Sequence, residues 1–529
     1  MKKIFLAIIF LGLIMGLSSC TKEYIIEDDL LLSQNIDDNY REYYEIFVGA
    51  FSDSNKDGIG DLQGVINRLD YLNDGEPDSG ESLGITGIWL MPIMDSPSYH
   101  KYDVIDYYSV DSDYGTLEDF ETLTKEAHDR GINVIIDLVL NHTSIYNDWF
   151  REAKQAVEDG DLDNKYIDYY TLVTDEEKLS GHTYYEFAGD LYYEGNFSST
   201  MPELNMDNQD VLDEIVDIMT FWFDLGVDGF RLDATKYVYY GDDTKNIAFW
   251  NWFSSEAEKI NEDAYIVGET WSSDNEIIEY YESFSNFDFG MAQSSGEVSL
   301  TANATYSVDS FVQYIISYRS RVEAVNEQAI LQPFISNHDM NRAAGYLSVD
   351  DYRMQMAANL YILSYGTPFI YYGEEIGMKG SRSTENTDAN RRLAMLWGDK
   401  DSVEDPIGST YSIDKQTNGT VKDQLDDESS LYNHYKKLIM IRHANPEIAR
   451  GTYTYLDFSS LFSIGGFIST YENSSVMVLH NTSGNAITIN LADYTNLDFE
   501  TIRAYVGMGE ATLDGQMLTI DGLTSVILK

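Results

Sequence analysis

The sequence is poor in cysteine and in basic residues, and its N-terminus lacks a long apolar run. Cys20 is the only cysteine among 529 residues, so no intramolecular disulfide can form. Lysine and arginine number 34 against 90 aspartate and glutamate, and the formal net charge of -56 should repel nucleic acid and anionic lipid. The apolar run Ile4 to Leu17 has 14 residues, which is short for a membrane-spanning helix of about 20. The sequence thus argues against a disulfide scaffold, a nucleic-acid partner and a spanning N-terminal helix.

The first 20 residues have the layout of an export signal. Lys2 and Lys3 precede the apolar run, and the small residues of Leu17-Ser18-Ser19-Cys20 follow it. This tetrapeptide resembles a bacterial lipobox, in which the cysteine is lipidated and becomes the new N-terminus. The alternative is an ordinary signal or anchor with an incidental cysteine. We predict a signal peptide over 1–19, lipidation at Cys20 and an acidic tether over 20–40. The protein would then lie in a bacterial cell envelope, outside the cytoplasm, and touch the membrane through its lipid anchor only.

The excess of acidic residues has two interpretations. It fits adaptation to high salt or loading with calcium, and it also fits a merely soluble, solvated surface, which is the interpretation we favour.

Short apolar runs alternate with amphipathic stretches along most of the chain. A chain of this length exceeds a single core, so two or three domains are expected. The predicted strands are Glu45–Ala50, Gly84–Met91, Asn133–Leu140, Gly226–Leu232, Ala264–Glu269, Phe284–Phe289, Ile330–Ile335 and Pro368–Tyr372. Between them lie helical patterns, such as the capping-box spacing Thr116 to Asp119 that opens an apolar stripe. Eight such units predict an α/β protein with a (β/α)8 barrel, and an open doubly wound sheet is the alternative.

Two stretches do not fit the alternating pattern. Residues 143–205 are too long for a structureless loop, so we predict a small domain inserted after the third strand. The barrel would then comprise 41–142 and 206–447, ending with a helix over Ser430 to His443. Beyond it, over 448–529, the apolar period switches to two, which predicts an antiparallel C-terminal β domain, a sandwich.

Three carboxyl groups occur at the ends of three predicted strands. Arg231 and Asp233 are two residues apart on one strand and share a face, so a cation lies beside a carboxylate that can attack carbon. Glu269 and Asp339 end later apolar runs. Because barrel enzymes place their functional groups at the C-terminal ends of strands, these acids predict one catalytic site.

Four segments then suggest a family. Asp137-Leu-Val-Leu-Asn-His142, Gly229-Phe-Arg-Leu-Asp233, Gly268-Glu-Thr-Trp271 and Phe334-Ile-Ser-Asn-His-Asp339 resemble, in order and spacing, the signature regions of the α-amylase family, glycoside hydrolase family 13. Met201-Pro-Glu-Leu-Asn205 resembles the fifth region, in a form between the oligo-1,6-glucosidase and neopullulanase types.

The resemblance implies a retaining mechanism. Asp233 would be the nucleophile that forms a glycosyl intermediate, Glu269 the general acid and then the base, and Asp339 a ligand of the sugar hydroxyls. His142, His338 and Arg231 would assist at the same sugar.

Aromatic and basic side chains would complete the substrate site. Tyr102, in Tyr99-His-Lys-Tyr-Asp103, would stack on that sugar, and Trp271 would line the leaving-group side. Relatives often have Lys-His three and four residues after the nucleophile, whereas this chain has Lys236 and Tyr237. Lys236 would still reach the leaving-group side.

The loop after the first predicted strand is a candidate calcium site. Asp53, Asn55 and Asp57, a carbonyl at Ile59 and Asp61 supply oxygen donors at the spacing of the first part of an EF-hand loop. Position 12 is Gly64, so the loop is no EF-hand, but similar loops of family members bind Ca²⁺. The alternative is an acidic, glycine-rich turn.

The leading hypothesis is endo-hydrolysis of α-1,4-glucosidic bonds in starch and maltooligosaccharides by a monomer. The alternatives are an exo-acting α-glucosidase, a cyclodextrin or pullulan hydrolase, a non-catalytic starch-binding surface lipoprotein, and an acidic calcium-buffering surface protein. The last leaves the strand-end acids unexplained.

Overall fold

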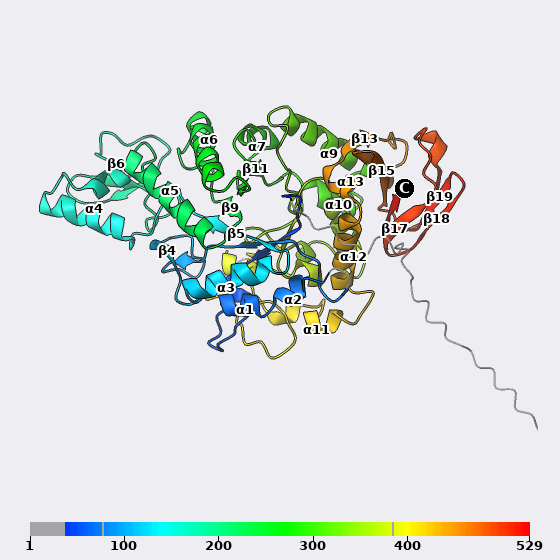
Figure 1. Cartoon of the computed structure of the whole chain (residues 1–529), viewed down its shortest axis with the longest axis horizontal. Coiled ribbons are helices and arrows are strands. Elements are labelled where there is room, and N and C mark those ends of the chain that lie inside the picture. The colour runs from blue at the N-terminus through cyan, green and yellow to red at the C-terminus, as the bar shows by residue number, and fades with distance from the viewer. Residues whose placement is uncertain (1–37, 77–78, 383–385) are drawn as a thin grey trace, which may run out of the picture.

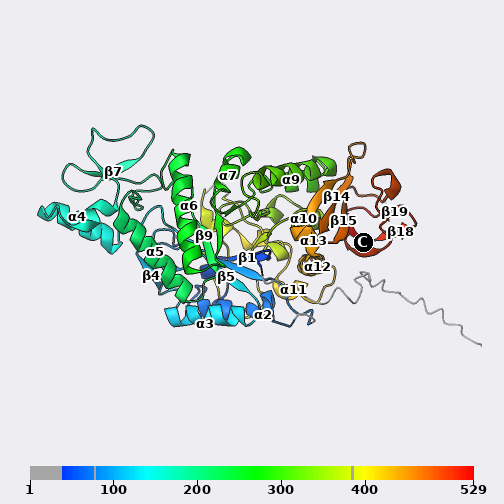
Figure 2. The same ribbon diagram turned by 45° about the horizontal axis from the view of Figure 1, so that its top comes forward.

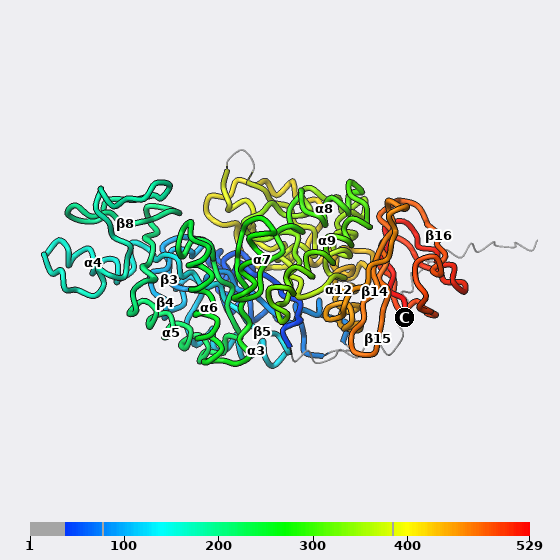
Figure 3. The backbone as a smooth tube through the Cα atoms, turned by 90° about the horizontal axis from the view of Figure 1, so that it is seen from above, coloured from blue at the N-terminus to red at the C-terminus, as the bar shows by residue number. Residues whose placement is uncertain are grey.

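The computed structural model describes residues 38–76, 79–382 and 386–529. The predicted signal peptide, Cys20 and most of the predicted tether lie outside these ranges. Within them, no helix combines the length and the apolar character needed to cross a bilayer. The molecule is elongated, with the barrel in the middle, the segment 143–205 at one end and the C-terminal sheets at the other (Figures 1 and 3).

A curled sheet of seven parallel strands forms the centre of the molecule. Its spatial order is β11 (Ser285–Asn286), β10 (Tyr265–Gly268), β9 (Gly229–Leu232), β5 (Asn133–Leu138), β2 (Gly87–Leu90), β1 (Tyr43–Ile46) and β12 (Phe369–Tyr371). Nearly all of their residues are buried, as expected for parallel strands covered on both faces. The predicted barrel-type fold is confirmed.

Two predicted strands are wrong in detail. The predicted strand Glu45–Ala50 ends at Ile46, and Val48–Ala50 form a 3₁₀ helix. Residues 330–335 form, within the described part of the chain, a single bridge from Gln332 to Phe287. Pro333 has no N–H to donate, so a regular ladder cannot continue through it. The segment still bonds on both sides: the Asp288 N–H donates to the Gln332 carbonyl (3.0 Å), and the Phe369 N–H donates to the Pro333 carbonyl (3.0 Å). It therefore fills the gap between β11 and β12.

Helices surround the sheet or join it to the C-terminal region. They are α1 (Leu62–Ile66), α2 (Leu69–Leu72), α3 (Leu117–His128), α5 (Gln209–Asp224), α6 (Asp243–Ile260), α7 (Asp274–Tyr280), α8 (Glu297–Ala302), α9 (Val308–Glu323), α10 (Arg353–Ile362), α11 (Val421–Gln424), α12 (Leu431–His443) and α13 (Pro446–Arg450). Figure 2 shows α3 on one side of the central strands and α6, α7 and α9 on the other. The predicted capping box at Thr116 forms, and α3 buries Phe120, Leu123 and Ala127.

The segment 143–205 has its own secondary structure. It contains α4 (Asp148–Asp159) and a small antiparallel sheet of β6 (Leu172–Val173), β8 (Tyr192–Glu194) and β7 (Tyr184–Glu186). A hairpin of β3 (Met94–Asp95) and β4 (Asp106–Val110) lies between β2 and α3 in the chain. The segment returns to the barrel where the Leu204 N–H donates to the Asn141 carbonyl (3.0 Å), directly after β5.

The C-terminal region consists of two antiparallel sheets, which confirms the predicted β domain. One contains β13 (Thr452–Tyr455), β14 (Ile464–Tyr471), β15 (Ser474–Asn481), β20 (Thr524–Leu528) and β17 (Ile502–Gly507). The other contains β16 (Ile487–Asn490), β19 (Met517–Ile520) and β18 (Ala511–Asp514). Leu479 of the first sheet and Leu518 of the second belong to one buried apolar cluster, so the two sheets share a core.

Candidate active site

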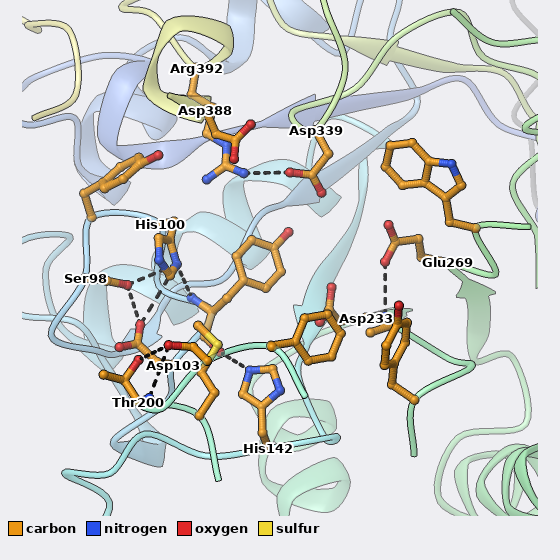
Figure 4. Close-up of a pocket in the computed structure, with 18 of the residues that line it drawn as sticks. Ser98, His100, Asp103, His142, Thr200, Asp233, Glu269, Asp339, Asp388 and Arg392 are labelled. Carbon is orange, nitrogen blue, oxygen red and sulfur yellow. Dashed lines mark hydrogen bonds and ion pairs between the residues drawn. The ribbon is translucent and has the colours of Figure 1, made fainter. Parts of the chain in front are cut away.

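The three predicted catalytic acids line one open pocket. Asp233 directly follows β9 and Glu269 directly follows β10, and the register pairs Leu232 with Gly268, so the two acids lie at the same edge of the sheet. Asp339 comes from the loop after residues 330–335. Figure 4 shows the three carboxyl groups facing one space. The predicted convergence of the three acids is therefore present.

This pocket has a volume of about 870 Å³. It is lined by Ser98, Tyr99, His100, Tyr102, Asp103, His142, Phe197, Ser198, Thr200, Met201, Asp233, Ala234, Lys236, Tyr237, Glu269, Trp271, Asp339, Arg382, Asp388 and Arg392. Acidic, basic and aromatic side chains therefore surround a space large enough for sugar units.

Arg231 connects the acids beneath the pocket floor. Its side chain is fully buried. Nη1 donates to both oxygens of Asp137 (2.8 and 3.0 Å) and to Oδ1 of Asp233 (2.8 Å), while Nη2 lies 3.0 Å from Oε2 of Glu269. One cation thus fixes three carboxyl groups, two of which are the predicted nucleophile and acid. The sequence predicts the contact with Asp233 but not those with Asp137 and Glu269.

The environment of Glu269 favours the protonated form. Burial raises the pKa of its carboxyl to about 7, and the charges of Asp233 and Asp339 add to this effect against Arg231, which lowers it. Oε2 also accepts a hydrogen bond from the Ala234 N–H (3.1 Å). Ala234 is left-handed (φ 48°), a conformation that is uncommon for a residue other than glycine and often found at functional sites. A carboxyl that still carries its proton near neutral pH can act as a general acid.

Asp339 has the opposite environment. Burial alone would raise the pKa of its carboxyl, but His338 and Arg392 outweigh that effect and hold the pKa well below its usual range. His338 Nε2 lies 3.1 Å from Oδ2, and Arg392 Nη2 lies 2.7 Å from Oδ1. Glu45 lies 2.5 Å from Nδ1 of His338. Burial alone would lower the pKa of the His338 imidazole, but the charges of Asp339 and Glu45 outweigh burial and raise this pKa to about 9. Asp339 is therefore a charged acceptor held by two cations.

Tyr102 and His142 also line the pocket. The Tyr102 ring stacks on His338 at 5.7 Å, and its hydroxyl lies 2.7 Å from Nε2 of His338 and donates to Asp137 (3.1 Å). His142 Nε2 lies 3.1 Å from the Tyr102 carbonyl oxygen, and burial lowers the pKa of this imidazole. Both side chains line the pocket that the three acids share.

Lys236 and Trp271 complete the predicted substrate residues. Lys236 Nζ donates to Ser272 (3.0 Å) and lies 3.6 Å from Glu276. The Trp271 side chain is 45% exposed, although its ring stacks on Phe289 at 5.1 Å. A supported aromatic face left open to solvent can take the apolar face of a sugar.

The sequence predictions assign no role to several residues of the site. Glu45 at the end of β1 holds His338, Arg392 holds Asp339, and Phe197 from the inserted segment lines the pocket. Asp137 lies inside a recognised motif, and a charged residue within the otherwise apolar run of β5 indicates a polar partner inside the barrel. Glu45 and Phe197 carry no comparable signal.

The predicted calcium loop lies after β1, apart from the pocket. Its oxygens wind the loop: Asp53 accepts from the N–H groups of Asn55 and Gly58, Asp57 accepts from Ile59, and Asp61 caps α1. Among the residues with described positions, no three His, Cys, Asp or Glu side chains converge as a metal centre requires. The donors are nonetheless hard oxygens with lone pairs to spare, which suits Ca²⁺ in its chemistry.

The family follows from comparison with known proteins. The family described as "Alpha amylase, catalytic domain" matches residues 45–451. This chain belongs to the α-amylase family. A second description, "Alpha-amylase SusG C-terminal domain", matches residues 464–527. Its relatives are glycoside hydrolases and glucan-transferring enzymes, so the chain is an enzyme of the α-amylase type.

Individual relatives cover most of the chain. "Alpha-amylase 3" of Dictyoglomus thermophilum is 36% identical over 83% of this chain and 84% of its own length. A "4-alpha-glucanotransferase" of Thermotoga maritima is 29% identical over 84% of this chain and 96% of its own length. Among solved structures, "Eubacterium rectale Amy13B" aligns with a TM-score of 0.85 at 35% identity, covering 93% of this chain and 96% of that one.

Proposed function

We propose that the protein is a retaining, endo-acting α-amylase that hydrolyses α-1,4-glucosidic bonds in starch and maltooligosaccharides. The observation that carries the proposal is the pair of contacts from Arg231, which hold Asp233 and Glu269 on adjacent nitrogens of one guanidinium in an open pocket. Retaining enzymes need such a close pair, with carboxyl groups about 5–5.5 Å apart. Asp339, opposite them, supplies a charged acceptor for sugar hydroxyls.

The chemistry is a double displacement. Asp233 attacks the anomeric carbon as Glu269 gives its proton to the departing glycosidic oxygen, and the glycosidic bond breaks as the glycosyl ester forms. Glu269, now a carboxylate, takes a proton from water, whose oxygen attacks the same carbon and releases Asp233. Burial of Glu269 favours the protonated start of this cycle. Arg231 and the Ala234 N–H stabilise the carboxylate that Glu269 becomes.

Product profiling on soluble starch, pullulan and maltotriose tests the proposal. An endo-acting enzyme releases mixed oligosaccharides early and lowers iodine staining faster than reducing ends appear. Release of glucose alone from the start indicates the exo-acting alternative, and preference for pullulan or cyclodextrin indicates that hydrolase type. Binding of starch without any cleavage would leave only the non-catalytic alternative.

We propose further that the loop Asp53–Asp61 binds one structural Ca²⁺, which orders the chain after β1 and takes no part in the chemistry. The hard oxygen donors and the hydrogen-bonded winding of the loop support this site.

We also propose a monomer that is anchored in the cell envelope through a lipid on Cys20. The lipobox-like Leu17-Ser18-Ser19-Cys20 supports this location. In a bacterial host the full chain should partition into detergent and carry a labelled fatty acid, and Cys20→Ser should do neither. Labelling that persists in Cys20→Ser would contradict the anchor.

A further inference from the structure

We propose that Phe197, Tyr237 and Tyr240, here called the aromatic array, bind the glucosyl units on the leaving-group side of an α-glucan beyond the pocket. The array thereby determines a preference for long chains. This inference rests on the proposed function and names the part of the substrate that the array recognises.

The rings of the array form a continuous row that starts inside the pocket. The Phe197 ring lies 5.4 Å from the His142 ring and 4.5 Å from the Tyr237 ring, and Tyr237 stacks on Tyr240 at 5.2 Å and 20°. Phe197 and Tyr237 line the pocket, whereas Tyr240 does not. The row therefore leads from the catalytic centre to the outside.

The two end members of the row are open to solvent. Phe197 is 44% exposed and Tyr240 is 39% exposed, although both are large aromatic side chains. Within the described part of the chain, neither the Tyr237 nor the Tyr240 hydroxyl has a hydrogen-bond partner. Apolar ring surface next to free hydroxyl groups is the chemistry that recognises a sugar, which presents C–H faces and hydroxyls together.

The two ends of the pocket differ, and the difference assigns the array to the leaving-group side. Arg392 and Asp388 surround the Asp339 end, and Figure 4 shows them on the opposite side of the space from His142. Tyr237 is four residues after Asp233, and its N–H donates to the Ala234 carbonyl (2.8 Å), while the Ala234 N–H donates to Oε2 of Glu269 (3.1 Å). The row thus passes beside the group that protonates the departing oxygen.

Tyr237 joins the two ends of the array. Its ring contacts Phe197 on one side and Tyr240, three residues later in the chain, on the other. A histidine at this position would offer one ring nitrogen and a smaller apolar surface, so the continuity of the row depends on Tyr237.

The competing explanation is that the array merely packs the inserted segment against the barrel. His182 of that segment meets the Tyr240 ring edge-on at 5.1 Å, so such packing exists. A purely structural role predicts that loss of Tyr240 lowers the thermal midpoint and changes the hydrolysis of short and long substrates equally. Recognition of a chain predicts a loss that depends on chain length.

The experiment compares kcat/KM for maltotriose and maltoheptaose in the full mature chain. Tyr240→Ala should lower the value for maltoheptaose about 3- to 10-fold, as expected for loss of one aromatic contact, and leave maltotriose within about twofold. Tyr240→Phe should keep most of the preference for maltoheptaose over maltotriose, and Tyr237→His should reduce this preference. The matched control is Tyr306→Ala, which removes a tyrosine that is 41% exposed and lies outside the pocket lining.

Binding to the Asp233→Asn protein, measured by calorimetry, supplies a second readout. Tyr240→Ala in this background should weaken maltoheptaose binding by the same factor. Equal losses for both chain lengths, or no loss, would overturn the array while leaving the hydrolase intact. If the wild-type chain neither cleaves nor binds maltoheptaose, the proposed function itself fails and the array fails with it.

Discussion

Arg231 Nη2 lies 3.0 Å from Glu269 Oε2, so the proposed general acid has a cation beside it. A cation lowers the pKa of a neighbouring carboxyl, yet burial outweighs it here and the pKa of Glu269 is raised to about 7. The same guanidinium bonds Asp233 and Asp137. Arg231 therefore limits how far burial can raise the pKa of the acid, while it orients the nucleophile.

Asp233→Asn should abolish hydrolysis, because an amide cannot form the glycosyl ester. We expect kcat on starch to fall by roughly 10³-fold or more. Circular dichroism should show a folded protein, since the amide oxygen can still accept from Arg231. The control is Asp263→Asn, an exposed acid before β10, which should keep wild-type rates. Starch cleavage at wild-type rates in Asp233→Asn would refute the assignment of the nucleophile.

Arg231→Met should destabilise the fold as well as the site. It leaves the buried Asp137 carboxylate without its two hydrogen bonds from Nη1. Breaking a buried ion pair from one side costs about 3–5 kcal/mol, so the free energy of unfolding in urea should fall by that order. Arg231→Lys keeps the positive charge but not the planar guanidinium, so its free energy of unfolding should lie between those of Arg231→Met and the wild type. A loss below about 1 kcal/mol for Arg231→Met would show that the cluster is not held by this cation.

Much of the site could be predicted because strand ends are readable in a sequence. Asp233 and Glu269 each end a short apolar run, and parallel strands bring their carboxyl ends to one edge. Pro333 was a readable signal too: it forbids a regular ladder in the seventh predicted strand, and the structure has only one bridge there.

The supporting contacts could not be predicted, because they join residues that no local period relates. Glu45 and His338 are 293 residues apart, and Arg392 reaches Asp339 from the loops after β12. The side chains that set the charge of Asp339 therefore appear only once the barrel is closed. Tyr240 likewise becomes part of a row only when Phe197 of the inserted segment meets Tyr237.

The pH dependence of activity should follow Glu269. Because the acid must be protonated, kcat/KM should fall as the pH rises through about 7. Arg231 lowers the pKa of Glu269, so Arg231→Lys, with a looser contact, should move this alkaline limb upward. If the residual activity of Glu269→Gln still falls at the same pH as that of the wild type, the alkaline limb belongs to a group other than Glu269.

The titration of Glu269 should also make the folded protein less stable as the pH rises. The folded pKa of Glu269 is raised from 4.5 to about 7, so folding binds a proton there. Below about pH 4.5 the group is protonated in both states and leaves stability unchanged. Between about pH 4.5 and 7 only the unfolded state releases the proton, so the folded state loses up to roughly 3 kcal/mol over this range. Glu269→Gln removes this titration, so its thermal midpoint relative to wild type should rise between pH 4.5 and 8. A constant difference across that range would contradict the raised pKa.

Removal of Ca²⁺ should lower stability without touching the chemistry. A ligand that binds only the folded state contributes about 2.7 kcal/mol at 100 times its dissociation constant, so chelation should lower the thermal midpoint by several degrees. Asp57→Asn is the sharpest variant, because Asn keeps an oxygen to accept the Ile59 N–H (2.9 Å) and loses only the charge. This variant should melt lower in Ca²⁺ than wild type and respond less to chelator, whereas Asp263→Asn should behave as wild type. Native mass spectrometry should find one Ca²⁺ per wild-type chain. A chain that carries no metal and melts at the same temperature with and without chelator would show that hydrogen bonds alone wind the loop.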